Sequence, residues 1–375
     1  MLKVAIVGCG KIADEHARLI RRVRSARLVA LYDAEPLMAQ QMHERFDRTP
    51  YYPNLDALLT EARPDVVHIT TPPQSHYDVA ARCLEAGCHV FVEKPFTMTA
   101  VDAARLIDTA TERQLKITVD HNLQFTEPAV RMRALVDQGF LGGPAVHVES
   151  HYCYNLGDPR YARAFLSDSG HWLRSLPGGL LQNIISHGLG RVAQYVRSDS
   201  PTVTAHGFTS AFLRALGETE LQDELRVLVR DDSTTAFFTF STQMHPQISQ
   251  LRVFGPANGL LIDDNHHVLI RMNGRKYRSY LEMVLPALDL SRQFAANAAR
   301  NLFGFAAGHL DMNEGMRELI ERFYRSVSHH EAPPIPYREI LLTSRVMDSV
   351  FAQLRASRNS DVLAETSRAC VSAGR

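Results

Sequence analysis

Five short apolar segments alternate with helical patterns in the first third of the chain, and this alternation restricts the fold more than any other sequence feature. The first segment, KVAIVG at residues 3–8, is rich in β-branched residues, and residues 11–23 follow with apolar side chains at helical spacing. The order repeats, with strands expected at 27–33, 65–70, 89–94 and 116–121 and helices at 36–47, 76–86 and 99–113. Near-continuous apolar strands that alternate with helices indicate a parallel sheet covered on both faces.

The rest of the chain shows a different pattern, and a length of 375 residues favours two domains. Few helical segments separate the later strands, so hairpins are expected. These strands are predicted at 145–153, 202–210, 225–230, 234–242, 248–254, 259–263 and 267–272, and amphipathic helices at 316–327 and 338–354. We therefore predict an α/β protein with a dinucleotide-binding domain at 1–122, a substrate-binding and oligomerisation domain at 123–356, and a fraying tail at 357–375.

Composition excludes several classes of partner. The 41 basic and 41 acidic side chains cancel without a basic run, so a nucleic-acid partner is not expected. The N-terminus enters a strand without a long apolar segment, which predicts a cytoplasmic protein with no membrane span. The five cysteines are odd in number and contain no CxxC pair, so neither a disulfide framework nor a metal site is predicted.

A glycine-rich turn joins the first strand to the first helix. Its residues are Gly8, Cys9, Gly10, Lys11, Ile12 and Ala13, a GxGxxA pattern. Gly8 would permit the tight turn, Gly10 would let a pyrophosphate approach the backbone, and Ala13 would allow close helix packing. Asp33, at the end of the second strand, can bind both ribose hydroxyls and would repel a 2′-phosphate, which favours NAD over NADP. The alternative for Asp33 is a helix N-cap.

Two further stretches, TTPPQSH at 70–76 and EAGCHVFVEKP at 85–95, complete a resemblance to the Gfo/Idh/MocA family of oxidoreductases. The resemblance implies a Rossmann domain followed by an α/β domain whose largely antiparallel open sheet faces the nicotinamide. It makes Lys94 the catalytic lysine, where a cation stabilises the negative charge that develops on an alcohol oxygen as hydride leaves. The other readings are a surface lysine for Lys94 and a helix N-terminal residue without a ligand for His76. Cofactor contacts are expected at Gly8, Gly10, Lys11, Ile12, Asp33, Thr71, Pro72, His76, Glu93, Lys94 and Asn122.

The stretch GGLLQNIISH places Asn183 and His187 one turn apart on a predicted helix at 181–196, opposite an apolar face. The family carries an aspartate and a histidine at this place, so His187 is the expected acid/base. Asn183 departs from the pattern. It could accept a hydrogen bond from the imidazole without supplying charge, leaving His187 a weaker base, or it could bind substrate. Gln124 is a second departure, because many relatives carry arginine there.

Substrate contacts are expected at the strand end and in the long segment 155–179 before this helix. The candidates are His121, Tyr161, Arg163, Trp172 and Arg174, because aromatic rings stack on sugars and arginine binds phosphate or carboxylate. The alternative is an ordinary surface loop. The amphipathic stretch 280–310 could cover the pocket, join subunits or touch a membrane surface, and core packing or subunit contact is favoured. We expect a homo-oligomer, a dimer or a tetramer.

These features predict an NAD-dependent oxidoreductase that acts on a secondary hydroxyl of a sugar, a cyclitol or a sugar derivative, phosphorylated and nucleotide-linked forms included. Two alternatives stay open. One is a redox-neutral elimination or epimerisation with retained NAD, and the other is a non-catalytic, dinucleotide-dependent sensor.

Overall fold

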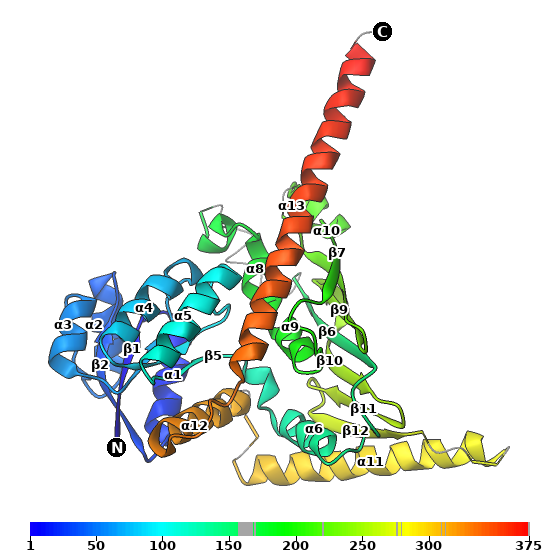
Figure 1. Ribbon diagram of the computed structural model, residues 1–375, viewed down its shortest axis with the longest axis horizontal. Coiled ribbons are helices and arrows are strands. Elements are labelled where there is room, and N and C mark those ends of the chain that lie inside the picture. Colours follow the sequence, from blue (N-terminus) through cyan, green and yellow to red (C-terminus); the bar gives the residue numbers. More distant parts are fainter. Residues whose placement is uncertain are drawn as a thin grey trace.

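The computed structural model describes residues 1–156, 168, 170–219, 221–274, 277–278, 280–308, 310–311 and 313–373, and beyond residue 357 only the backbone is described. Two sheets organise the chain (Figure 1). The first has five parallel strands in the order β2-β1-β3-β4-β5. They are β1 (Leu2–Val7), β2 (Ala26–Tyr32), β3 (Val66–Ile69), β4 (His89–Val92) and β5 (Ile117–Val119).

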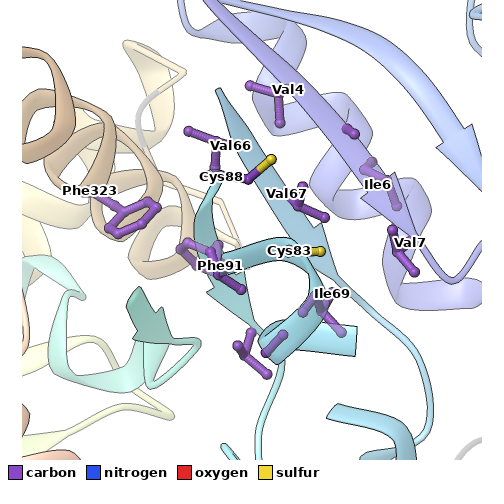
Figure 2. Close-up of a cluster of buried hydrophobic side chains, with 14 of the residues drawn as sticks. Val4, Ile6, Val7, Val66, Val67, Ile69, Cys83, Cys88, Phe91 and Phe323 are labelled. Atoms are coloured by element: carbon purple, nitrogen blue, oxygen red, sulfur yellow. The ribbon is translucent and has the colours of Figure 1, made fainter. Parts of the chain in front are cut away.

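Helices cover both faces of this sheet, as the sequence predicts. Consecutive side chains from Val4 to Val7 are at most 1% exposed, and successive strand residues point to opposite faces. Figure 2 shows Val4, Ile6 and Val67 in this core. The helical segments are α1 (Lys11–Arg22), α2 (Pro36–Arg45), α3 (Leu55–Ala57), η1 (Leu58–Ala62), η2 (Pro73–Ser75), α4 (His76–Glu85) and α5 (Ala100–Glu112).

The second sheet has seven strands in the order β12-β11-β10-β6-β9-β8-β7. All neighbours are antiparallel except β6 and β9, so the prediction of a largely antiparallel sheet is confirmed. The strands are β6 (His147–Asn155), β7 (Thr202–Phe208), β8 (Glu224–Arg230), β9 (Thr235–Ser241), β10 (Gln243–Phe254), β11 (Asn258–Asp263) and β12 (Val268–Asn273). Each overlaps one of the seven predicted segments.

Helices pack on one face of the second sheet, where Val227 and Phe238 are buried, while Phe237 on the other face is 48% exposed. The helical segments are η3 (Asn122–Gln124), α6 (Glu127–Asp137), η4 (Trp172–Ser175), α8 (Gly179–Ile184), α9 (Ser186–Ala193), α10 (Ala211–Ala215) and α11 (Leu281–Ala306). Across the described parts of the chain, no helix combines the length and apolarity needed to cross a membrane.

The C-terminal part of the chain contacts both cores. Helix α12 (Glu314–His329) packs on the first sheet, and Figure 2 shows its Phe323 beside Phe91 of β4. Helix α13 (Tyr337–Ala373) packs against α5, α9 and β7 and then projects away from the molecule (Figure 1). The expected fraying tail from residue 357 is therefore a continuation of α13, since Ala, Leu, Arg and Glu in this segment favour a helix. The division at residue 122 stays a prediction, because α12 returns to the first core.

Candidate functional site

The glycine turn lies where the strand order of the first sheet reverses. The chain runs from β1 to β2 on one side and then to β3 on the other, so a crevice opens at the carboxyl ends of β1 and β3. Gly8 follows β1 with a φ of +95°, and a Cβ on it would lie 2.7 Å from the backbone carbon of Thr70. Both the backbone conformation and the space therefore require glycine at this position.

The N-terminus of α1 faces open space at the same crevice. The helix begins at Lys11, and its N-cap, Gly10, supplies no side-chain hydrogen bond. A Cβ on Gly10 would meet no atom within 4 Å. The first N–H groups of a helix lack internal partners and attract anions, so this end of α1 fits a pyrophosphate.

The Asp33 carboxylate braces the turn from the end of β2. It accepts hydrogen bonds from the backbone N–H groups of Cys9, at 2.6 Å, and of Glu35, at 2.8 Å. The N-cap of α2 is Glu35, so Asp33 is not the helix cap that the sequence left open. Each carboxylate oxygen retains acceptor capacity for a ribose hydroxyl.

A cavity of about 600 Å³ lies over the turn. Its walls come from the glycine turn, the ends of β2, β3 and β4, and the helices before α9. The lining residues are Gly8, Gly10, Lys11, Ile12, Asp33, Ala34, Thr70, Thr71, Pro72, Pro73, Ser75, Glu93, Lys94, Trp172 and Asn183. Nine of the predicted cofactor residues belong to this set, so the cradle, the uncapped helix and the carboxylate together fit an NAD molecule.

Two predicted cofactor residues, His76 and Asn122, lie outside this lining. His76 is fully buried, and its Nδ1 and Nε2 lie 2.8 Å and 2.9 Å from the carbonyl oxygens of Pro95 and Thr71. It therefore ties together the two loops that carry the cavity wall. Asn122, in η3, has a buried Oδ1 without a hydrogen-bond partner among the described residues.

Lys94 links the cavity to the second domain. Its Nζ donates to the backbone oxygen of Asn183 at 3.2 Å and to the Asn183 Oδ1 at 3.3 Å. The Asn183 amide oxygen thus contacts the lysine, not the imidazole of His187 that the sequence suggested as one partner. Burial lowers the pKa of Lys94, while the neighbouring Glu93 and Asp120 oppose this shift.

The helix that carries the Asn-His pair is divided. The sequence predicts one helix at 181–196, but α8 ends at Ile184 and α9 begins at Ser186. The predicted apolar face packs against the second core, where Ile184 is only partly buried and also lines a separate pocket. Gly188 of α9 approaches the sheet so closely that a Cβ on it would lie 2.0 Å from the Phe238 ring.

His187 lies near Lys94 and stays neutral at neutral pH. Burial lowers its pKa well below the ordinary value, and the charges of Lys94 and His121 lower it further. Its Nδ1 has no hydrogen-bond partner among the described residues, and its ring centroid lies 5.3 Å from that of Tyr152. A neutral imidazole with an unused nitrogen can accept a proton from a hydroxyl group.

The domain junction near the site contains His121 and Gln124. Burial lowers the pKa of His121 to about 4, and neither ring nitrogen has a hydrogen-bond partner within the described residues. Gln124, the second departure from the family pattern, donates from Nε2 to the carbonyl of Gly190 at 2.9 Å. The amide therefore fixes η3 against α9.

A buried polar cluster lies behind Lys94. The His16 Nε2 is 2.9 Å from Oε1 of Glu93, and Glu93 Oε2 accepts the Lys94 backbone N–H at 3.1 Å. Burial and the Glu93 charge raise the pKa of Asp120 well above its ordinary value. The potential metal-ligating atoms of His16, Glu93 and Asp120 lie within 4.8 Å of one another. The direct His16–Glu93 contact shows that hydrogen bonds already join this cluster.

A second cavity of about 460 Å³ lies between the second sheet and the helices before α9. It is lined by Tyr152, Cys153, Tyr154, Leu156, Leu173, Leu180, Ile184, Gln247, Ser249, Asp264 and Asn265. Because Tyr152 also contacts the His187 ring, this cavity adjoins the proposed acid/base.

The predicted substrate residues are not gathered in this second cavity. Trp172 lines the dinucleotide cavity, and Arg174 pairs with Glu218 through contacts of 3.1 Å and 2.5 Å. Tyr161 and Arg163 lie outside the described residues.

The site also contains four residues that were not predicted from the sequence, namely His16, His68, Asp120 and Tyr152. A histidine within the apolar strand DVVHIT and an aspartate at the end of KITVDH were visible signals, since a polar side chain in a buried strand needs a partner. Tyr152 lies on an ordinary alternating strand and gave no such signal.

Comparisons with known proteins identify relatives of this chain. Residues 2–121 match the family model described as "Oxidoreductase family, NAD-binding Rossmann fold". The D-glucoside 3-dehydrogenase of Escherichia coli K12 is 34% identical over 142 residues, which cover 38% of this chain and 40% of that protein. The UDP-N-acetylglucosamine 3-dehydrogenase of Acidithiobacillus ferrooxidans is 31% identical over 130 residues, 35% of this chain and 40% of that protein. The chain thus matches less than half the length of these relatives.

The likeness to solved structures extends further along the chain. The WlbA dehydrogenase of Bordetella pertussis, solved in complex with NADH and UDP-GlcNAcA, superposes with a TM-score of 0.74. The match covers 95% of this chain and 96% of that one at 18% identity. At this identity the likeness establishes the fold alone.

Proposed function

We propose that this chain is an NAD-dependent dehydrogenase of sugar-like alcohols, because residues 2–121 match the Gfo/Idh/MocA model of an oxidoreductase family with an NAD-binding Rossmann fold. The observation that carries the proposal is the contact of Lys94 Nζ with Asn183. It brings the lysine of the dinucleotide cavity to the helical segment that leads to His187. A cation, a neutral base and a dinucleotide cradle therefore meet at one junction.

The proposed reaction removes a hydride from a carbinol carbon and a proton from its hydroxyl, leaving a ketone. NAD, when bound, supplies the hydride acceptor. The Lys94 ammonium stabilises the alkoxide-like oxygen that develops during transfer. His187 accepts the hydroxyl proton, and its low pKa keeps the unprotonated form available at neutral pH. In the reverse direction the imidazolium returns that proton.

The substrate proposed for the second cavity is a sugar, a cyclitol or a sugar derivative. Tyr152 and Tyr154 supply flat surfaces that can pack on a sugar ring, and Gln247, Ser249 and Asn265 supply polar groups. The described lining contains no lysine or arginine, which favours a neutral polyol in this cavity. A phosphate or nucleotide group of a larger substrate would therefore extend beyond these walls.

Turnover measurements test the function. The purified protein is incubated with NAD and with separate cyclitols, free sugars, sugar phosphates or nucleotide sugars while NADH absorbance is followed. We expect NADH formation with at least one substrate and loss of most turnover in Lys94→Ala and His187→Ala. Wild-type activity in either variant would remove the role assigned to that residue. Product formation without added NAD or released NADH would instead indicate a redox-neutral cycle, and NAD binding without any product would indicate a sensor.

We also propose that the protein is a homo-oligomer joined through α11. This helix exposes a set of large apolar side chains that is unusual for a monomer surface. The most exposed are Met283 (84%), Phe303 (75%), Phe305 (72%) and Leu302 (71%). Its two acidic and two basic residues cancel, so the helix lacks the basic face that attracts anionic membranes. A second copy of the chain is therefore the proposed occupant of this surface.

Light scattering after size-exclusion chromatography tests the assembly. Phe303→Asp places a charge in the apolar surface and should reduce the mass to that of a monomer. Ser291→Asp adds the same charge to an exposed polar position of α11 and should leave the mass unchanged. A wild-type monomer, or an unchanged mass in Phe303→Asp, would contradict the proposed interface.

A further inference from the structure

Four buried polar side chains form a continuous column through the first domain. The Tyr324 hydroxyl lies 2.8 Å from His68 Nε2, the His68 Nδ1 lies 2.8 Å from His16 Nδ1, and the His16 Nε2 lies 2.9 Å from Glu93 Oε1. Both histidines are inaccessible to solvent, and Tyr324 and Glu93 are buried. The column starts on α12, crosses β3 and α1, and ends beside Lys94 at the end of β4.

The donors in this column can be assigned by chemistry. An ionised Glu93 only accepts, so His16 must donate from Nε2, and a neutral His16 then accepts at Nδ1. His68 must therefore donate from Nδ1 and accept at Nε2, and Tyr324 donates its hydroxyl proton. This arrangement uses every donor. If His16 were an imidazolium, His68 would donate to the tyrosine oxygen, and the buried hydroxyl proton of Tyr324 would lose its acceptor, the His68 Nε2.

The packing holds His68 in the orientation that this column needs. Its ring stacks on Phe91 with centroids 4.6 Å apart and an interplanar angle of 4°. Phe323, the neighbour of Tyr324, packs edge-on against the same Phe91 at 5.7 Å, as Figure 2 shows. Helix α12, which comes from the C-terminal part of the chain, is thus fixed on the strands that carry the column.

The column ends at two buried carboxyl groups, those of Glu93 and Asp120, which lie beside Lys94. A carboxylate oxygen of Glu93 and one of Asp120 lie within 4.8 Å of each other, and the Asp120 Oδ1 has no hydrogen-bond partner among the described residues. The hydrogen bond from His16 and the positive charge of Lys94 oppose the burial penalty, and the pKa of Glu93 lies below its usual range. The titratable groups that interact electrostatically with Glu93 are His16, His76, Lys94, Asp120, His121 and His187.

We propose that Tyr324, His68 and His16 form a hydrogen-bonded chain that points its donors toward Glu93 and keeps this carboxylate ionised beside Lys94. The chain thereby leaves the proton of the carboxyl pair on Asp120. Tyr324 and His68 are positioning residues, because they act on Lys94 only through His16 and Glu93. The effect on catalysis rests on the proposed function, whereas the proton positions do not.

Nuclear magnetic resonance of the full chain with ¹⁵N-labelled histidine tests the donor direction. Loss of a signal in His16→Gln or His68→Phe assigns each ring. We expect His16 as the Nε2–H tautomer and His68 as the Nδ1–H tautomer at neutral pH. An Nε2–H tautomer of His68, or a doubly protonated His16, would reverse the chain and overturn the proposal.

Infrared spectroscopy with ¹³C-labelled aspartate or glutamate tests where the proton of the carboxyl pair lies. In the wild type, a carboxylic-acid band should shift with labelled aspartate and disappear in Asp120→Asn. In His68→Phe, which keeps the ring and its stacking, part of this band should shift with labelled glutamate instead. A wild-type band that belongs to Glu93, or a His68→Phe band that stays wholly on aspartate, would contradict the proposed chain.

A matched variant separates positioning from packing. Phe91→Leu disturbs the same core contacts but leaves every polar atom of the column in place, so it should lower stability without moving the infrared band. With an active substrate, His68→Phe should lower kcat by about tenfold and change the KM for NAD much less, because His68 itself does not line the cofactor cavity. Equal losses of kcat in His68→Phe and Phe91→Leu would show that His68 contributes to turnover only through core packing. If the wild-type protein shows no turnover, the proposed dehydrogenase function is refuted. The resonance and infrared spectra would still test the proton positions in the column.

Discussion

The substitution Asn183→Asp tests the electrostatic contact that joins the two halves of the site. The Asn183 Oδ1 lies 3.3 Å from Lys94 Nζ, so the new carboxylate would stand next to the ammonium group. At that separation and an effective dielectric constant of about 20, the attraction is about 5 kcal/mol. Burial of the new charge offsets part of this energy, and we expect the pKa of Lys94 to rise by about 1–2 units.

The pH dependence of Lys94 acetylation by a trace reagent measures this shift without a substrate. The buried wild-type lysine should titrate below its usual range, and Asn183→Asp should titrate at higher pH. Asn183→Leu is the control, because it removes the contact without adding charge and should not raise the pKa of Lys94. The same new anion should raise the pKa of His187, so the acidic limb of turnover should move to higher pH. Unchanged Lys94 titration in Asn183→Asp would refute the proposed electrostatic coupling.

Three further outcomes are expected. Gly188→Ala should destabilise the protein by about 1–3 kcal/mol in a denaturant titration, because the new Cβ would overlap the Phe238 ring. Gly10→Ala should leave the stability unchanged, because a Cβ there meets no atom, but it should weaken NAD binding measured by calorimetry. Asp33→Asn should lower the ratio of NAD to NADP affinity about tenfold, and an unchanged ratio would exclude a charge-based preference. Burial keeps the pKa of His121 at about 4 in the folded protein. In the unfolded chain this histidine binds a proton as the pH falls below about 6.5, whereas in the folded protein it stays neutral until about pH 4. Protonation of the unfolded chain should therefore lower the free energy of unfolding by about 3 kcal/mol at pH 4. Thermal unfolding midpoints that do not fall over this range would contradict that burial.

The part of the site that depends on local sequence could be predicted. The glycine turn needs a positive φ at Gly8, and an acidic residue at the next strand end is recognisable from spacing, so the dinucleotide cavity could be read in the sequence. The substrate contacts expected in the segment before α8 could not be judged from local sequence. There Arg174 pairs with Glu218, a residue 44 positions away that no local pattern connects with it.

The sequence by itself determined the two kinds of sheet, since the period of apolar residues and the turn chemistry are local properties. Only the tertiary structure decided which sheet each later amphipathic helix covers. An apolar face specifies that a helix is buried but not its partner, and α12 packs on the first sheet although the second domain precedes it in the chain. For the same physical reason the contact of Asn183 with Lys94 and the column from Tyr324 to Glu93 depend on the fold. Lys94 and Asn183 are 89 positions apart in the sequence, and His68 and Tyr324 are 256 positions apart. Hydrogen bonds between such distant residues form only when the fold brings their elements into contact.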